Sequence, residues 1–202
     1  MYRPPAFAED RADVMAALIR ANPLGLLIST GANGPTANAL PFELTSDGRL
    51  KTHLSKANPQ LAELADGAPV LVVFNGEQSY VTPSWYPTKQ QTGKVVPTWN
   101  YLMVQARGRP VLHADADWLR DQISALTGQM EQGREEPWAV SDAPEDYIAG
   151  RLRGIVGLEI EVTEMQGKWK ADQNKAEPDR TRFASALSES HPTLAAAALR
   201  TS

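Results

Sequence analysis

Hydrophobic and polar positions along the chain follow two different periods, one helical and one alternating. Residues 10–21 carry apolar side chains at helical spacing, and the Asn-Pro pair that follows predicts the end of a helix. Residues 24–30 and 36–44 are short strand-like runs separated by GANGP, a turn-forming sequence, which together predict a β-hairpin. Asn38 is a polar residue on an otherwise apolar face of the second strand, so its amide needs a partner.

The middle of the chain continues with short strands and one helix. A strand near residue 50 leads to a helix predicted over residues 59–65. Residues 69–74 are apolar on both faces, and after an Asn-Gly pair the chain resumes as a strand at residues 79–82. We expect these runs to lie deep in a barrel or under a partner subunit, whereas residues 83–93 have the composition of a loop.

The second half contains two strands that flank a helical region. Residues 95–107 alternate two non-polar sets, so burial on both faces and hence dimerisation are expected. Residues 116–130 and 145–153 have helical spacing and are predicted to lie outside the barrel. Residues 155–164 alternate cleanly, which predicts a half-buried strand with Glu159 facing outward. The pattern as a whole predicts an α+β domain of many short strands with peripheral helices.

Composition narrows the class of protein. A chain of 202 residues, 42% hydrophobic and 22% charged, has the composition of a globular protein with one principal domain. Its apolar runs are too short to cross a bilayer and its start lacks a signal pattern, so we expect a cytoplasmic protein with no membrane partner. The absence of cysteine excludes disulfides, thiolate nucleophiles and cysteine-bound metal. A net charge of −4 argues against a broad DNA-binding surface but leaves a local basic patch open.

The first candidate site is THLSKANPQ, residues 52–60. Ser55 and Lys56 stand immediately before a predicted helix that Asn58 would cap. Free N–H groups, a hydroxyl donor and an ammonium group at such a place favour a phosphate. The alternative is a solvated lysine beside an ordinary capped turn.

The second candidate site lies in residues 79–101, where aromatic, hydroxyl and amide side chains are concentrated. A flat heteroaromatic ligand needs apolar contacts on its faces and a few polar partners at its edge. The side chains that fit this need are Trp85, Tyr86, Trp99 and Asn100. Alternatively, Trp99 is an interface aromatic and Lys89 a loop charge.

A third cluster, GKWKADQNK at residues 167–175, combines lysines with the amides of Gln173 and Asn174. It could close over a phosphate or a ring carbonyl, although such a basic turn is more often solvated surface. Metal binding is not predicted, because the three histidines are dispersed without a metal-ligand spacing. Fingerprints of hydrolases, P-loop NTPases and Rossmann proteins are also lacking in the sequence.

The run PSWYPTKQQTGKVVPTWNY resembles the signature of the FMN-binding negative transcriptional regulators, the PaiB-like family. The segments MYRPPAF, ANALPF, HLSKANPQ and EEPWAVSDAPEDYIAGRLRGIVGLEIEVTEMQGKWKADQNK fit the same family in order, to about residue 180. This resemblance implies a split β-barrel related to pyridoxamine-phosphate oxidase and flavin-reductase proteins. It also implies a homodimer with FMN bound at the subunit interface.

The resemblance and the residue chemistry together give one set of candidate FMN-binding residues. These are Asn38, His53, Ser55, Lys56, Trp85, Tyr86, Lys89, Thr98, Trp99, Asn100, Gln173 and Asn174. The resemblance places the phosphate near Ser55 and Lys56, with His53 adjacent, and the ring near the Trp-Tyr loop and the Thr-Trp-Asn strand. Asp172 and Lys175 depart from the family pattern, which has a small hydroxyl residue before the Gln-Asn pair and an arginine after it.

The implied function is negative regulation of transcription by an FMN-binding protein, with DNA contact direct or indirect. The alternative is an FMN-dependent oxidoreductase that uses a nicotinamide or another electron donor, for which the sequence identifies no catalytic residue. A third interpretation is a module that stores flavin or binds a partner and has neither regulatory nor enzymatic activity. Residues 1–180 are expected to form one split-barrel FMN-binding domain with a helical insertion at about 115–153. Residues 181–202 form a tail, either a short helix or a frayed end.

Overall fold

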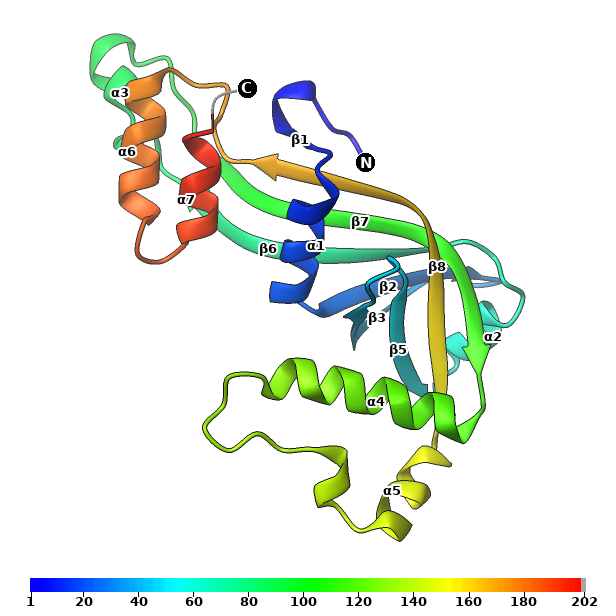
Figure 1. The fold of residues 1–202 in the computed structure, drawn as a ribbon. Helices are drawn as coiled ribbons and strands as arrows, with labels where there is room; N and C mark the ends of the chain where they lie inside the picture. The colour runs from blue at the N-terminus through cyan, green and yellow to red at the C-terminus, as the bar shows by residue number, and fades with distance from the viewer. Residues whose placement is uncertain (201–202) are drawn as a thin grey trace. The chain divides into compact units, whose positions relative to one another are not determined.

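The computed structural model describes residues 1–200, which form a mixed α/β structure built on one antiparallel sheet (Figure 1). The strands are β1 (Ala8–Glu9), β2 (Leu24–Gly31), β3 (Gly34–Pro41), β4 (Glu43–Leu44), β5 (Leu50–Ser55), β6 (Val70–Val81), β7 (Thr98–His113) and β8 (Ile155–Lys170). The helices are α1 (Ala12–Ala21), α2 (Gln60–Leu64), α3 (Pro87–Thr92), α4 (Ala116–Glu131), α5 (Glu145–Leu152), α6 (Glu177–Leu187) and α7 (Pro192–Ala198), with 3-10 turns η1 (Pro5–Phe7), η2 (Pro83–Trp85) and η3 (Val140–Asp142). The strand order is β3-β2-β6-β7-β8-β5-β4, and β1 pairs with β8.

The chain divides into two compact units. Unit 1 comprises Met1–Ala21, Asn75–Gln105 and Gln166–Ser202, and unit 2 comprises Asn22–Phe74 and Ala106–Met165. Three long strands, β6, β7 and β8, contribute one part to each unit. Each unit is therefore described by itself.

Unit 2 is held together by strand pairing around an apolar core. The hairpin β2–β3 pairs in register from Leu24 opposite Pro41 to Gly31 opposite Gly34, and β5 pairs with β8. The core side chains Leu27, Phe42, Phe74, Leu158 and Ile160 are fully buried. A Cβ atom at Gly25 would lie 2.6 Å from the Phe74 ring, so this strand position has room only for glycine.

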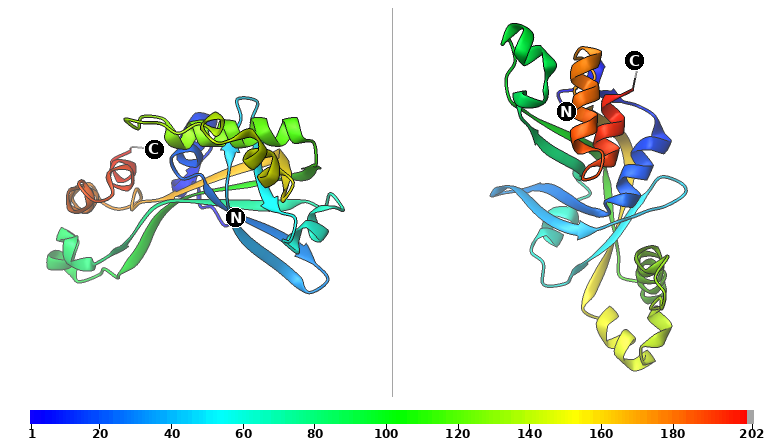
Figure 2. Two further views of the ribbon diagram at one scale, coloured as in Figure 1. Left: turned by 90° about the horizontal axis from the view of Figure 1, so that it is seen from below. Right: turned by 90° about the vertical axis from the view of Figure 1, so that its left-hand side faces the viewer.

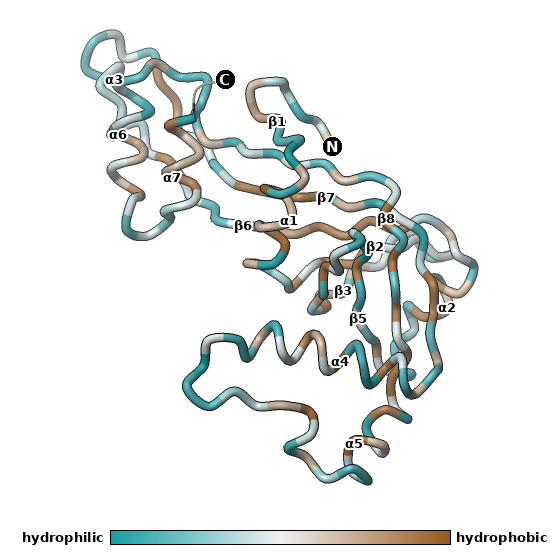
Figure 3. The backbone as a smooth tube through the Cα atoms, in the orientation of Figure 1, coloured by the Kyte–Doolittle hydropathy of each residue, from teal (hydrophilic) through white to brown (hydrophobic). Residues whose placement is uncertain are grey.

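The helical region of unit 2 contains α4 and α5 (Figure 2). Leu119 of α4 is buried with Ile148 and Leu152 of α5, and Trp118 packs against that cluster. Asp115 caps α4 by accepting a hydrogen bond from the Trp118 amide at 2.9 Å. Figure 3 shows the connection from α4 to α5 as hydrophilic where it leaves α4 and mixed farther on, where Val140 is buried against both helices.

Unit 1 contains α1 and the paired helices α6 and α7, which lie side by side in Figures 1 and 2. Met15, Leu18 and Ile19 are the buried face of α1, as the spacing predicts. The α7 end of the chain is attached through the Leu194 amide, which donates to Glu77 at 2.7 Å. Within residues 1–200 no helix is both long enough and apolar enough to span a bilayer.

The structure confirms most predicted elements. The helix at residues 10–21, the hairpin, the helices at 116–130 and 145–153 and the strand at 155–164 are all present, with shifts of a few residues at their ends and a longer last strand. The fold is α+β, as predicted.

Three local predictions were wrong. The Asn75-Gly76 pair does not end a strand, because β6 runs through it and Gly76 packs close to Leu18 and Leu102. The segment 83–93 contains η2 and α3 in place of an irregular loop, with Gly93 at a φ of 65° closing the helix. Glu159 does not face solvent. It is buried, and its carboxylate accepts a hydrogen bond from Arg49 at 2.5 Å.

Candidate functional site

The candidate site in unit 2 begins with the two faces of β5. Leu50, Thr52 and Leu54 are buried on one face, whereas His53 and Ser55 lie on the other. His53 stands directly opposite Gly157 of β8 in the antiparallel ladder. The alternation of this short strand therefore separates the core side chains from the candidate site side chains.

Helix α4 covers the His53 face and fixes the imidazole. Gln122, which is 2% exposed, places its Oε1 atom 2.8 Å from His53 Nδ1. An amide oxygen only accepts, so Nδ1–H donates in this pair and Nε2 is the ring nitrogen left for another partner. The close approach of α4 depends on Gly157, because a Cβ there would lie 2.2 Å from the Trp118 ring.

A pocket of about 410 Å³ opens beside these residues. It is lined by His53, Ser55, Ile123, Gly150, Arg151, Leu152, Gly154 and Ile155. This volume is within the range of small-molecule sites, roughly 300–1,000 Å³. The loop after β5 is joined to the pocket wall because the Lys56 amide donates to the Gly154 carbonyl at 2.9 Å.

Arg151 is the residue of this pocket that the sequence analysis missed. It lies near the end of α5, almost a hundred residues after Ser55 along the chain, and no short motif links the two. Its guanidinium group is a strong partner for phosphate oxygens. The pocket thus combines an imidazole, a hydroxyl and a guanidinium group.

The structure gives little support to the prediction that the N-terminus of α2 helps to bind the phosphate. Asn58 accepts a hydrogen bond from the Gln60 amide at 3.0 Å, as a capping residue does. However, α2 has only five residues, so its dipole contributes little. Lys56 is exposed and Ser55 Oγ accepts from the Ala57 amide at 3.2 Å, so the hypothesis now depends on side chains and on the pocket.

Asn38 has the partner that its position requires, and that partner is protein. Its Nδ2 donates to Gln60 Oε1 at 2.8 Å. Gln60 is fully buried and its own amide donates to Ser29 Oγ at 2.9 Å. This network attaches α2 to the hairpin and gives Asn38 a structural role, while contact with a cofactor stays a prediction.

The other candidates lie in unit 1. Trp85 of η2 packs against Phe183 with ring centroids 6.5 Å apart. Tyr86 is buried and its hydroxyl donates to Asp172. Burial, together with that carboxylate, raises the pKa of Tyr86, so the hydroxyl stays protonated. Lys89 is exposed and donates to Ser84 at 3.1 Å.

Thr98, Trp99 and Asn100 follow one another at the start of β7. The Lys170 ammonium group donates to Thr98 Oγ1 at 2.5 Å and to the Trp99 carbonyl. Burial lowers the pKa of Lys170. Asn100 is fully buried, and both polar atoms of its amide have no partner among residues 1–200. An unpaired buried amide is costly unless a ligand or water completes it.

The Gln173–Asn174 pair follows β8 in a tight turn at Asp172, whose φ is 61°. Gln173 Oε1 accepts from the Ala171 amide at 2.8 Å and its Nε2 donates to the Trp169 carbonyl. Asn174 is exposed. The Lys175 ammonium lies 4.4 Å from the centre of the Tyr86 ring. The turn is therefore internally bonded, and because Lys168 and Asp172 are buried the cluster is not simply a solvated basic surface.

An apolar face remains open on β6 and β7 within unit 1. Tyr80 and Trp99 are each 51% exposed, and their ring centroids lie 6.1 Å apart. Leu102 and Val104, on the opposite face of β7, are buried. One of the two apolar faces of β7 is therefore buried within a single chain, and the face that carries Trp99 is partly exposed.

Each unit has groups that suit one part of a flavin nucleotide. In unit 2 the pocket of His53, Ser55 and Arg151 has donors for a phosphate. In unit 1 the unpaired amide of Asn100 has both a donor and an acceptor, as the edge of a flavin ring requires. No group of three metal-ligating side chains occurs within the part of the chain that the structure describes.

Solved structures define the class. An FAD- and heme-binding protein from Mycobacterium smegmatis has a TM-score of 0.61 and 20% identity, over 81% of this chain and 73% of that chain. A protein described as a "putative 5-nitroimidazole antibiotic resistance protein" from Bacteroides thetaiotaomicron has a TM-score of 0.59 and 15% identity, over 80% of this chain and 85% of that chain. The fold is thus that of the flavin-binding split-barrel proteins, which confirms the predicted architecture.

Sequence comparison gives the family within this class. Residues 1–164 match the family described as "Putative FMN-binding domain". The chain belongs to this FMN-binding family, and FMN is its cofactor. The Bacillus subtilis protease synthase and sporulation protein PAI 2 is 30% identical, over 89% of this chain and 85% of that protein. An uncharacterized protein of Emericella nidulans is 36% identical, over 89% and 87%.

Proposed function

We propose that FMN is held with its phosphate in the pocket of unit 2. The observation that carries this proposal is the convergence of His53, Ser55 and Arg151 on one pocket of about 410 Å³. Ser55 would donate its hydroxyl and Arg151 its guanidinium fork to phosphate oxygens. Gln122 positions His53 so that Nε2 is the ring nitrogen left for a ligand. When bound, FMN supplies a ring that accepts and donates electrons.

The binding experiment measures FMN affinity by quenching of flavin fluorescence during titration of flavin-free protein. Arg151→Gln is expected to weaken binding about tenfold or more, because a charge-assisted hydrogen bond is lost. The matched control is Arg153→Gln, which removes an exposed arginine outside the pocket lining and should leave the affinity unchanged.

Two results would contradict different parts of this proposal. Unchanged affinity in both Arg151→Gln and Ser55→Ala would exclude the pocket as the phosphate site. A colourless protein that takes up no added FMN would contradict FMN binding itself. A loss of affinity in Lys56→Ala alone would move the phosphate to the loop that follows β5.

We propose that the protein is a homodimer with FMN at the subunit interface, as the family resemblance implies. The exposed Tyr80–Trp99 face supports this, because a partner would bury it. Light scattering should give twice the 22.0 kDa of one chain. Trp99→Lys should yield a monomer, whereas a dimer of unchanged stability would place the interface elsewhere.

We propose negative regulation of transcription as the biological role. The name of the PAI 2 relative, which refers to protease synthesis and sporulation, supports a regulatory role. The charge distribution also supports contact with DNA: unit 1 has eleven Lys and Arg against eight Asp and Glu, whereas unit 2 has nine against sixteen. The net charge of the whole chain is therefore negative although unit 1 by itself has a positive net charge.

Direct repression is tested by fluorescence anisotropy on the upstream region of the gene at a stated salt concentration. Saturable binding that prefers this sequence over a scrambled one is expected. Arg182→Glu, in exposed unit 1 sequence, should weaken it, and Arg134→Glu, in unit 2, should not. Binding that is blind to sequence would exclude direct repression.

An FMN-dependent oxidoreductase is the second candidate, and the fixed His53 favours it because a positioned imidazole can transfer protons. Anaerobic mixing with NADH or NADPH should bleach the flavin bands if this candidate is correct. Without bleaching, a nicotinamide-linked reductase is excluded.

A further inference from the structure

A second cavity lies in unit 1, with a volume of about 450 Å³. Its lining residues are Pro5, Ala6, Ala8, Glu9, Arg11, Trp169, Gln173, Leu199 and Arg200. They come from the first and last segments of the chain and from the end of β8. None of the residues of the proposed phosphate pocket is among them.

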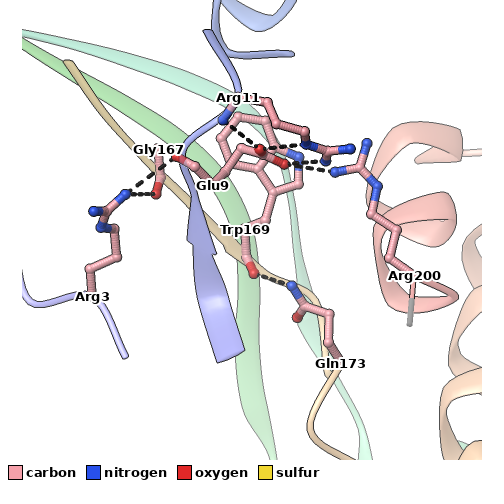
Figure 4. A network of polar contacts seen from close by, with 7 residues as sticks. All are labelled: Arg3, Glu9, Arg11, Gly167, Trp169, Gln173 and Arg200. Atoms are coloured by element: carbon pink, nitrogen blue, oxygen red, sulfur yellow. Dashed lines mark hydrogen bonds and ion pairs between the residues drawn. The ribbon is translucent and has the colours of Figure 1, made fainter. Parts of the chain in front are cut away.

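A buried carboxylate that pairs with two arginines is the main polar feature of this cavity. Figure 4 shows the guanidinium groups of Arg11 and Arg200 both directed at the Glu9 carboxylate. Arg11 Nε donates to Glu9 at 2.8 Å, and Arg200 Nη1 donates at 2.8 Å. The Glu9 side chain is 6% exposed, whereas those of Arg11 and Arg200 are 55% and 43% exposed.

The three groups in contact, Glu9, Arg11 and Arg200, have one positive charge in excess, which Asp13 near Arg11 offsets in part. Within residues 1–200, Glu9 is the one carboxylate at ion-pair distance from Arg11 or Arg200. The hydrogen bond from Arg11 lowers the pKa of Glu9, so the carboxylate is ionised at neutral pH. Each guanidinium group has five N–H donors, and Arg200 uses one of its nitrogens on Glu9. The exposed remainder can pair with an anion.

The cavity wall is fixed by contacts of its own. Arg3 donates to the Glu9 and Gly167 carbonyls at 3.3 and 3.5 Å and pairs with Asp10 at 2.5 Å. Gln173 is held by the backbone of the turn that follows Trp169. A wall that needs no rearrangement reduces the entropy cost of binding.

We propose that this cavity binds a small organic monoanion with an apolar body and one carboxylate. The body would contact Pro5, Ala6 and Leu199, which are apolar, and the carboxylate would pair with Arg11 and Arg200. A single carboxylate neutralises the single excess charge. A phosphate dianion would leave a net negative charge beside the buried Glu9, so it fits less well.

The test is calorimetric titration of the protein as purified with benzoate, with benzyl alcohol as the neutral control of similar shape. Saturable heat is expected with benzoate and not with benzyl alcohol. Arg200→Gln should weaken benzoate binding about tenfold, since a charge-assisted hydrogen bond is lost. Arg182→Gln, which removes an exposed arginine of α6 outside the cavity, should bind benzoate like the wild type.

Four outcomes would overturn the proposal. They are the absence of saturable benzoate binding to the wild type, equal binding of benzyl alcohol, tighter binding of inorganic phosphate than of benzoate, and unchanged benzoate binding in a folded Arg200→Gln variant. Release of FMN by benzoate, followed by flavin absorbance after filtration, would also count against it, because the two sites would then be one. The result does not depend on the phosphate pocket of unit 2, whose failure the Arg151→Gln titration detects separately.

Discussion

Gly157→Ala is the substitution that most directly tests how the proposed phosphate pocket is built. Gly157 lies opposite His53 in the β5–β8 ladder and beneath the Trp118 ring. The added methyl carbon would lie 2.2 Å from Trp118 Cζ3, whereas carbon atoms in contact prefer about 3.5–4.0 Å. The ring also stacks on His113 with centroids 4.1 Å apart, so relieving the clash disturbs a second contact.

The expected loss of stability follows from this close contact. Overpacking of a close contact destabilises a protein by about 1–3 kcal/mol. Gln122 lies one helical turn after Trp118 on α4, so displacement of the helix also lengthens the bond from Gln122 to His53. We therefore expect a loss of about 1–3 kcal/mol in the free energy of unfolding, and weaker FMN binding with it.

Urea unfolding followed by circular dichroism measures the first effect and FMN titration the second. The control is Gly128→Ala, also on α4, where an added Cβ meets nothing within 4 Å. It should stabilise the protein by about 0.5–1 kcal/mol, because glycine is unfavourable inside a helix. A Gly157→Ala variant as stable as the wild type would refute the close-contact argument. Lower stability with unchanged FMN affinity would refute the link between α4 and the pocket.

Three further predictions concern polar side chains. Gln60→Leu should lower the free energy of unfolding by about 2–3 kcal/mol in urea, since a fully buried hydrogen-bond network is broken, and a loss below about 0.5 kcal/mol would contradict that role. Glu9→Gln should destabilise at pH 7. The pKa of Glu9 is lowered from 4.5 in the folded state, so the ionised carboxylate stabilises the protein above pH 4.5 and this stabilisation is lost on acidification. Thermal melts of the wild type and the variant should therefore converge in acid. A stability difference that does not change with pH would contradict the role of the ionised carboxylate. Glu145→Ala should change stability by less than about 0.5 kcal/mol, because its ion pair with Arg120 is exposed, and a larger loss in thermal melts would show that the pair is coupled to the fold.

Local patterns in the sequence predicted the elements whose stability is set by burial of one face. The alternation of β8 and the spacing of Met15, Leu18 and Ile19 on α1 require those faces to be buried in any compact arrangement. The short GANGP turn brings its two flanking strands side by side, so they pair as a hairpin. The family motifs carried the FMN assignment, because they extend over most of the chain.

Other features could not be predicted because they depend on residues far apart in sequence. From its position on an alternating strand Glu159 should face outward. It can be buried because Arg49 and Lys51 pair with its carboxylate. Asn75-Gly76 has the composition of a turn, but packing of Gly76 against Leu18 keeps the strand extended. A local preference of a few tenths to about 1 kcal/mol is easily outweighed by such contacts.

The candidate site divides in the same way. The sequence by itself determined the α+β split-barrel class and the family, and it predicted Ser55 as part of the flavin site, since these depend on contiguous residues. Only the tertiary structure decided that Gln122 orients His53, that Arg151 joins Ser55 in one pocket, and that Arg200 meets Glu9. Each of these pairs is separated by tens to nearly two hundred residues, and no local period or propensity can encode a contact that exists only after the sheet and helices have packed.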